Sequence, residues 1–279
     1  MTAWTTFASV AGVVTVLLLL ASHTTSRRFD DDEDAGPRGG RVDADAVDSN
    51  PRDAVAPREF GADVEAADAV EVPGVRERGA ARPPALSQPM LLLNVAFSQG
   101  VFAVVLVAAA VLADVPRGAL GLGGDHVTWW FVAVGAALGV GLYAANEVGG
   151  SLADAAGLGQ SEELRELLAP TSRRGWVVLL GGVLPIVAAF EELLFRGVLV
   201  GALATGFGVS PWLLVLVSSV LFGLGHGAQG RLGVLVTGTL GVVLAAAFVL
   251  SGSLVVVVVA HYLVNALEFV VHESVLGAE

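Results

Sequence analysis

The sequence predicts an all-α, polytopic integral membrane protein with about seven transmembrane helices, and three observations support this. The 279-residue chain is 54% hydrophobic, with a mean hydropathy of +0.73, and is therefore more apolar than soluble domains usually are. Its apolar residues gather in runs of about 20, the length of helix that crosses a bilayer core. Its 15 basic residues are all arginine, and they collect in alternate connections between the runs.

The predicted transmembrane helices follow from these apolar runs and from the polar or glycine-rich stretches between them. They cover residues 4–22, 90–115, 127–148, 176–205, 211–227, 232–250 and 254–271. No positive charge precedes the first run, so we interpret it as a retained helix, with a cleaved signal peptide as the alternative. Trp129 and Trp130, at the start of the third run, are typical of a membrane–water interface.

Residues 23–89 predict a disordered acidic loop. This segment holds 15 of the 27 acidic residues and nine of the 15 arginines, with few aromatic residues and no sustained periodicity. Such a composition cannot bury a core, so we interpret the loop as a solvated spacer, with a regulatory tether as the alternative. The acidic, lysine-free balance resembles that of proteins from a halophilic archaeon. It argues against nucleic-acid binding, which requires a basic face.

The placement of arginine predicts the orientation in the membrane. Because arginine is enriched in cytoplasmic connections, we expect the amino terminus outside the cell membrane and the acidic loop and carboxy terminus in the cytoplasm. The chain then divides into a first transmembrane helix (residues 1–22), the acidic loop (23–89), two transmembrane helices with an amphipathic connector (90–174) and a four-helix core (175–279).

The fourth apolar run contains two carboxylates and an arginine, at Glu191, Glu192 and Arg196. A charge at the bilayer centre costs at least about 2.5–3.5 kcal/mol on insertion scales, so buried ionisable groups predict a function. Glu192 and Arg196 are four residues apart, so they share one helix face and can neutralise each other. Glu191 lies about 100° around the helix and stays available for chemistry. A purely structural ion-pair triad is the alternative.

Two later runs each carry a pair of residues at i, i+4 spacing that includes a histidine. These pairs are Phe222 with His226 and His261 with Asn265. Taken alone, each is explained by a buried core histidine or by a polar clamp between helices. If their helices converge on Glu191, the three runs together supply a carboxylate base, two imidazoles and an amide.

Other polar residues lie near the ends of the runs. Asn146 and Glu147 fall at the end of the third run, and we expect their side chains to reach towards the membrane surface. Glu268 and His272 form another i, i+4 pair near the carboxy terminus, which we interpret as a cap or surface pair at the membrane interface. The sequence assigns none of these residues to the functional site.

The ordered motifs EExxxR, FxxxH and HxxxN resemble those of the CPBP family of intramembrane proteases. That family includes the CAAX prenyl endopeptidases and the bacteriocin-processing and self-immunity (Abi) proteins. Here the motifs begin at Glu191, Phe222 and His261, and the resemblance covers roughly residues 175–271. Each motif alone is weak, whereas their order, spacing and transmembrane setting are specific in combination. The resemblance implies an intramembrane endopeptidase whose catalytic core is residues 175–279.

The resemblance also implies roles for individual residues. The catalytic residues would be Glu191, His226, His261 and Asn265, and the supporting residues would be Glu192, Arg196 and Phe222. The first two catalytic residues would activate a water, and the other two would line the oxyanion site. No cofactor is favoured. The alternative is a zinc ion held by Glu191, His226 and His261 with water as the fourth ligand, although no HExxH motif supports it.

We expect a membrane-associated protein or peptide as the substrate, with a prenylated CAAX-type protein as one candidate, and the lipid bilayer as the other partner. Two different functions compete with this hypothesis. A proton-coupled carrier would use the buried glutamates, histidines and arginine as a relay, but it predicts internal repeats, which the sequence does not show. A non-catalytic scaffold would act through the acidic loop and would tolerate loss of the buried motifs.

Overall fold

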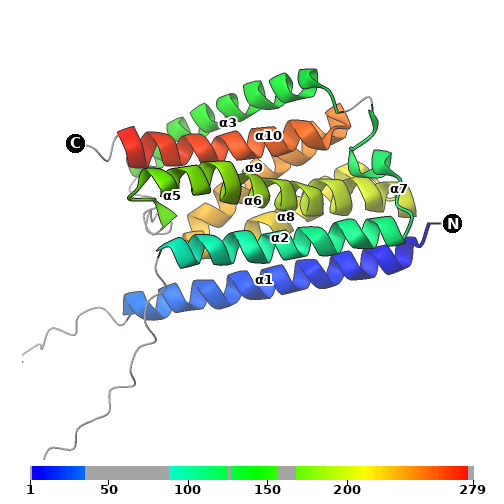
Figure 1. Ribbon diagram of the computed structural model, residues 1–279, viewed down its shortest axis with the longest axis horizontal. Helices are drawn as coiled ribbons and strands as arrows, with labels where there is room; N and C mark the ends of the chain where they lie inside the picture. Colours follow the sequence, from blue (N-terminus) through cyan, green and yellow to red (C-terminus); the bar gives the residue numbers. More distant parts are fainter. Residues whose placement is uncertain (1, 35–87, 125–126, 156–167, 276–279) are drawn as a thin grey trace, which may run out of the picture. The chain divides into compact units, whose positions relative to one another are not determined.

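The computed structural model describes residues 2–34, 88–124, 127–155 and 168–275. Within these ranges the regular structure is helical and contains no strand, which confirms the predicted all-α fold (Figure 1). Most of the predicted acidic loop, at residues 35–87, lies outside the described residues. The same holds for residues 156–167 of the predicted amphipathic connector.

Six of the described helices are long and apolar enough to cross a membrane. They are α1 (Trp4–Asp34), α2 (Gln88–Leu112), α3 (Trp129–Ala155), the continuous helix Arg173–Phe207, α9 (Gly230–Ser251) and α10 (Leu254–Phe269). The continuous helix consists of α5 (Arg173–Val178), the π-helix η3 (Leu179–Val183), α6 (Leu184–Glu192), the π-helix η4 (Leu193–Ala202) and α7 (Leu203–Phe207). The remaining elements are η1 (Arg117–Leu120), α8 (Pro211–Leu224), η5 (Gly227–Gln229) and η6 (Val270–Val275).

The helix α8 is shorter than the span predicted over residues 211–227. It has 14 residues, which at about 1.5 Å per residue extend about 21 Å, less than the roughly 30 Å of a bilayer core. It ends at Leu224 with Gly225 as its C-cap, where three glycines alternate with other residues and lower the helix propensity. His226 therefore lies in the turn that follows α8 rather than within a helix.

The helix α1 extends beyond the apolar run that predicted it. The run stops at residue 22, whereas the helix continues to Asp34 and includes the first part of the segment predicted as a loop. Once a first turn has formed, each further residue adds a backbone hydrogen bond at little cost. A helix that begins in the apolar run can therefore continue into polar sequence.

The described helices run side by side, mostly along one common direction (Figure 1). The helix α3 packs along α10, α8 packs along α9, and α6 contacts both α2 and α10. Two glycines bring α3 onto α10, since a Cβ at Gly135 or Gly139 would come 2.5 or 2.8 Å from the carbonyl oxygen of Val256 or Ala260, respectively. The G-x-x-x-G spacing lets the two backbones approach closely, as is common between membrane helices.

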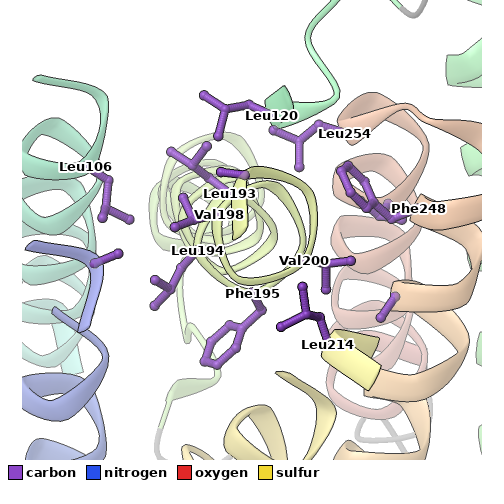
Figure 2. Packing of buried hydrophobic residues seen from close by; sticks show 14 of the residues in the cluster. Leu106, Leu120, Leu193, Leu194, Phe195, Val198, Val200, Leu214, Phe248 and Leu254 are labelled. Carbon is purple, nitrogen blue, oxygen red and sulfur yellow. The ribbon is translucent and has the colours of Figure 1, made fainter. Parts of the chain in front are cut away.

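The apolar core surrounds η4. The buried side chains of η4 include Leu194, Phe195 and Val198, and Figure 2 shows them directed outward from η4. Leu106 of α2 and Phe248 of α9 lie on opposite sides of η4 in this view. The segment that follows the paired glutamates is thus enclosed by neighbouring helices, which fixes the helix that carries them.

The contact between α3 and α10 predicts that alanine substitutions at two glycines of α3 change the melting temperature differently. Alanine is the better helix former by about 1 kcal/mol. Gly141→Ala, with nothing within 4 Å of the added Cβ, should therefore leave the melting temperature of the detergent-solubilised protein unchanged or raise it. Gly139→Ala should lower it by a few degrees or more, because the added Cβ meets the backbone of Ala260. Equal melting temperatures for the two variants would contradict this packing.

Candidate active site

The paired glutamates lie where α6 passes into the π-helix η4. Glu191 and Glu192 are the last two residues of α6, and the ten residues after them form η4. A π-helical turn is wider than an α-helical one and is frequent at functional sites. The hydroxyl of Ser218 in α8 donates to the carbonyl oxygen of Phe195 in η4 at 2.6 Å. This bond holds α8 against the helix that carries the glutamates.

Glu192 neutralises a fully buried cation and also holds a histidine. Its Oε1 accepts from Arg196 Nη1 at 2.8 Å and from His261 Nδ1 at 2.7 Å, and Glu192 and Arg196 are both 0% exposed. The ion pair predicted from the i, i+4 spacing is therefore present. The other end of the guanidinium donates from Nη2 to the carbonyl oxygen of Gly241 at 3.2 Å. The Glu192 carboxylate thus joins Arg196 of η4 to His261 of α10, and Arg196 in turn contacts α9.

The ring of Phe222 contacts both the buried cation and the two imidazoles. Arg196 Cζ lies 4.3 Å from the centre of this ring, within the range of a cation–π interaction. The His226 and His261 rings lie 4.7 and 5.8 Å from the Phe222 ring, centre to centre. Phe222 therefore touches three of the polar side chains named by the motifs, and its supporting role stays a prediction.

Glu191 is buried beside two imidazoles but takes no part in the ion pair. Its Oε2 lies 3.8 Å from His226 Nε2 and 3.7 Å from His261 Nε2. Both distances exceed a direct hydrogen bond. Among the described residues this oxygen has no hydrogen-bond partner, although its side chain is only 9% exposed. The two adjacent carboxylates therefore have different surroundings, one paired with Arg196 and one facing histidines.

His226 is held in the turn after α8 by the backbone of the preceding helix. Its Nδ1 lies 2.8 Å from the carbonyl oxygen of Phe222. Because a carbonyl oxygen only accepts, Nδ1 carries the proton. In the neutral ring Nε2 then presents a lone pair towards Glu191. Two acceptors thus face each other across 3.8 Å, an arrangement that a donor such as water can bridge.

The bond to Glu192 also fixes the orientation of His261. Since a carboxylate oxygen accepts, Nδ1 of His261 donates to Glu192, and Nε2 is directed towards Glu191. Nε2 is therefore a hydrogen-bond donor only when the ring carries both protons. Asn265 is half-buried one turn further along α10, at a rise of about 6 Å from His261.

The structure brings three of the four predicted catalytic residues together: Glu191, His226 and His261. Asn265 lies on α10, four residues after His261. The sequence analysis missed Ser218, which fixes the Phe195 carbonyl. A signal for it was present, because Ser218 and Ser219 are polar residues inside an otherwise apolar run.

A cavity of about 510 Å³ lies close to this cluster and is separate from it. Its lining is almost entirely apolar and includes Ala189 and Leu193. Each of these residues is two positions from Glu191, or about 200° around an α-helix, so the cavity lies on the side of α6 away from the Glu191 carboxylate. The polar cluster is therefore not the wall of this cavity.

The alternative zinc ligands do not form a compact group. Among the described residues, the three ligands whose donor atoms all lie within 4.8 Å of one another are Glu147, Glu268 and His272. Glu191 approaches each imidazole separately, but Glu191, His226 and His261 do not meet this criterion as a set. Zinc at the candidate active site would therefore require its three ligands to move closer together.

Comparison with known families supports the resemblance drawn from the motifs. Residues 173–267 match the family model described as type II CAAX prenyl endopeptidase Rce1-like. The match contains all three motifs, and it confirms the similarity to the CPBP proteases. Searches of curated proteins and of solved structures gave no match.

The buried ion pair predicts that substitutions of Glu192 and Arg196 have coupled effects on the free energy of unfolding. Glu192→Gln should lower the free energy of unfolding by about 3–5 kcal/mol, because Arg196 is then buried without a counter-charge. Replacing Arg196 by Met in the same protein should recover much of this loss, because both charges are then absent. The Gln oxygen can still accept from His261 in that double variant. Unfolding in detergent would be followed for the single and double variants.

Glu191→Gln is the matched control, since it makes the same chemical change one residue away. This variant should unfold close to the wild type, because the ion pair is left intact. A double variant no more stable than Glu192→Gln alone would show that the stability loss does not come from a stranded Arg196.

Proposed function

We propose that the chain is an intramembrane endopeptidase that uses Glu191 as its base, since residues 173–267 match the family model of type II CAAX prenyl endopeptidases, Rce1-like. The observation that carries this assignment is the position of the Glu191 carboxylate. It is buried, lies outside the ion pair, and faces the Nε2 atoms of His226 and His261 at 3.8 and 3.7 Å. A buried carboxylate that is not neutralised by arginine is suited to accept a proton.

Water activation follows from the two acceptors that face each other. A water between Glu191 Oε2 and His226 Nε2 would donate one O–H to each and keep a lone pair for the substrate carbonyl carbon. As the water attacks, its proton passes to Glu191, which makes the oxygen a stronger nucleophile. His226 orients the water, because its own ring is fixed by the Phe222 carbonyl.

The attack forms a C–O bond and places negative charge on the former carbonyl oxygen. The Asn265 amide would donate to this oxyanion, and one such donor typically lowers the barrier by about 2.7–4 kcal/mol. The resemblance assigns His261 to the same oxyanion site, where Nε2 would donate only when the ring carries both protons, because Nδ1 donates to Glu192. The C–N bond then breaks and the proton on Glu191 passes to the leaving nitrogen. A carboxylic acid and an amine result, and the remaining proton of the water passes between them to give a carboxylate and an ammonium group.

We favour this metal-free mechanism over zinc. The lack of a compact three-ligand group at Glu191, His226 and His261 supports it. In the zinc alternative these residues would hold the ion, and Glu192 would orient His261 by accepting a hydrogen bond from its Nδ1, as carboxylates often do behind metal-bound histidines. The metal would then lower the pKa of its bound water, and Glu191 would be a ligand instead of the base.

The proposed substrate is a membrane-associated protein or peptide, with a prenylated CAAX-type tail as the first candidate. The family supports this choice, because its description names CAAX prenyl endopeptidases. A prenyl chain would keep the substrate in the bilayer while its peptide reaches the buried cluster. The same family match favours hydrolysis over the carrier and scaffold alternatives.

We also propose that the protein resides in the cell membrane with its amino terminus outside, on the basis of the arginine distribution. Protease treatment of intact cells should then remove a tag at the amino terminus and spare a tag at the carboxy terminus. The opposite protection pattern would reverse the orientation and place the acidic loop outside.

The assignment of Glu191 predicts loss of catalysis without loss of fold. Glu191→Gln should reduce the cleavage rate of a farnesylated CAAX peptide at least about 100-fold, because the proton acceptor is removed. Its melting temperature in detergent should stay near that of the wild type. Cleavage would be followed by mass spectrometry, beside the same peptide without the farnesyl group.

Glu273→Gln provides a matched carboxylate-to-amide control outside the cluster and should retain the wild-type rate. Wild-type activity in Glu191→Gln would remove Glu191 from the mechanism. Equal cleavage of both peptides would keep the endopeptidase assignment and exclude a requirement for the prenyl group.

A further inference from the structure

The two imidazoles beside Glu191 are held in different ways. His261 donates directly to Glu192, so a side-chain bond ties it to the helix that carries both glutamates. The His226 ring is instead bonded to the Phe222 carbonyl at the end of α8, and its Nε2 stays 3.8 Å from Glu191. Among the described residues, no hydrogen bond ties the His226 ring to the glutamate-bearing helix. The distance between His226 and Glu191 therefore depends on how α8 lies against that helix.

One buried hydroxyl joins α8 to the glutamate-bearing helix. Ser218 Oγ donates to the main-chain carbonyl oxygen of Phe195 at 2.6 Å, and Ser218 is 1% exposed. Within the part of the chain that the structure describes, this is the one hydrogen bond between the two helices. Phe195 lies four residues after Glu191, in the π-helix η4. The bond thus fixes α8 at a point about one helical turn from the proposed base.

The same serine is placed to set the position of His226. Phe222 lies four residues after Ser218 on one face of α8, and its ring meets the Phe195 ring at 5.0 Å between centres. The Phe222 carbonyl oxygen accepts from His226 Nδ1 at 2.8 Å. Aromatic pairs are favourable over centre distances of about 4.5–7 Å, so the ring contact tolerates sliding. A hydrogen bond weakens steeply away from its preferred geometry, so the hydroxyl fixes the register of α8.

We propose that Ser218 is a positioning residue of the peptidase, which holds α8 so that His226 Nε2 and Glu191 Oε2 stay one water apart. The inference rests on the proposed function and gives Ser218 no contact with the substrate. Without the hydroxyl, α8 is free to shift along η4, and one water no longer bridges both acceptors. A displacement of about 1 Å can cost about 100-fold in rate, so a small shift is enough to slow turnover.

Two substitutions of Ser218 test this role in the full-length protein, with cleavage of the farnesylated CAAX peptide as the assay. Ser218→Ala should lower kcat at least about tenfold and leave KM within about twofold, because the water is misplaced while the substrate still binds. Ser218→Cys keeps a weak donor and should recover part of the lost kcat. A wild-type kcat in folded Ser218→Ala would overturn the proposal. If Ser218→Ala does not fold, Ser218→Cys carries the test, and a wild-type kcat there overturns it.

Two matched controls remove a hydroxyl without releasing α8 from η4. Ser219 is the adjacent buried serine, but its Oγ donates within α8, to the Val215 carbonyl oxygen at 2.6 Å. Tyr262 donates between helices, from α10 to the Leu180 carbonyl oxygen in η3 at 3.1 Å, while His261 keeps its own bond to the glutamates. Ser219→Ala and Tyr262→Phe should therefore keep kcat within about twofold of the wild type. An equal fall in all three hydroxyl-deletion variants would refute a specific role for Ser218.

The outcomes also separate this inference from the proposed function. If Glu191→Gln is inactive while the Ser218 variants cleave at the wild-type rate, the inference fails and the proposed function stands. If Glu191→Gln keeps the wild-type rate, the proposed function fails, and the positioning role of Ser218 fails with it.

Discussion

Burial of the Arg196 guanidinium is the constraint on which the rest of this site depends. Arg196 is 0% exposed in a helix long and apolar enough to span a membrane, so its charge requires compensation inside the protein. Glu192 supplies the counter-charge, the Gly241 carbonyl accepts a hydrogen bond, and the Phe222 ring covers the cation. These contacts draw α8, α9 and α10 around η4, and the bond from Glu192 to His261 turns the neutralised pair into a support for an imidazole.

The division of labour between the two glutamates follows from this constraint. Arg196 lies one turn from Glu192 and therefore engages that residue, which leaves Glu191 to face the histidines. A peptidase that uses carboxylate chemistry in a membrane needs one carboxylate that is not neutralised by a permanent cation. The adjacent pair supplies both a counter-charge for Arg196 and a carboxylate that is not neutralised, because successive positions on a helix point in directions about 100° apart.

Features set by spacing along one helix were predictable from the sequence, whereas those set by packing between helices were not. The pairing of Glu192 with Arg196 follows from i, i+4 geometry in any helix. The bond from His261 to Glu192, 69 residues apart, depends on how closely α10 packs. The sequence does contain a signal for a different contact of α10, the one with α3, because Gly135 and Gly139 have the G-x-x-x-G spacing. The position at which α8 ends depends on the glycines around Gly225. The catalytic role of Asn265 stays a prediction.

The shortness of α8 has a consequence for the surrounding lipid. If α8 crosses the bilayer, it is about 9 Å shorter than the hydrocarbon core, and the bilayer beside it would have to become thinner. The turn that carries His226 would then lie below the level of the headgroups, where exposed peptide groups need water or protein around them. A local depression of the membrane surface would bring water to a depth that apolar helices otherwise keep dry. The proposed hydrolysis consumes water, and hydrophobic mismatch would deliver it to the site without a permanent channel.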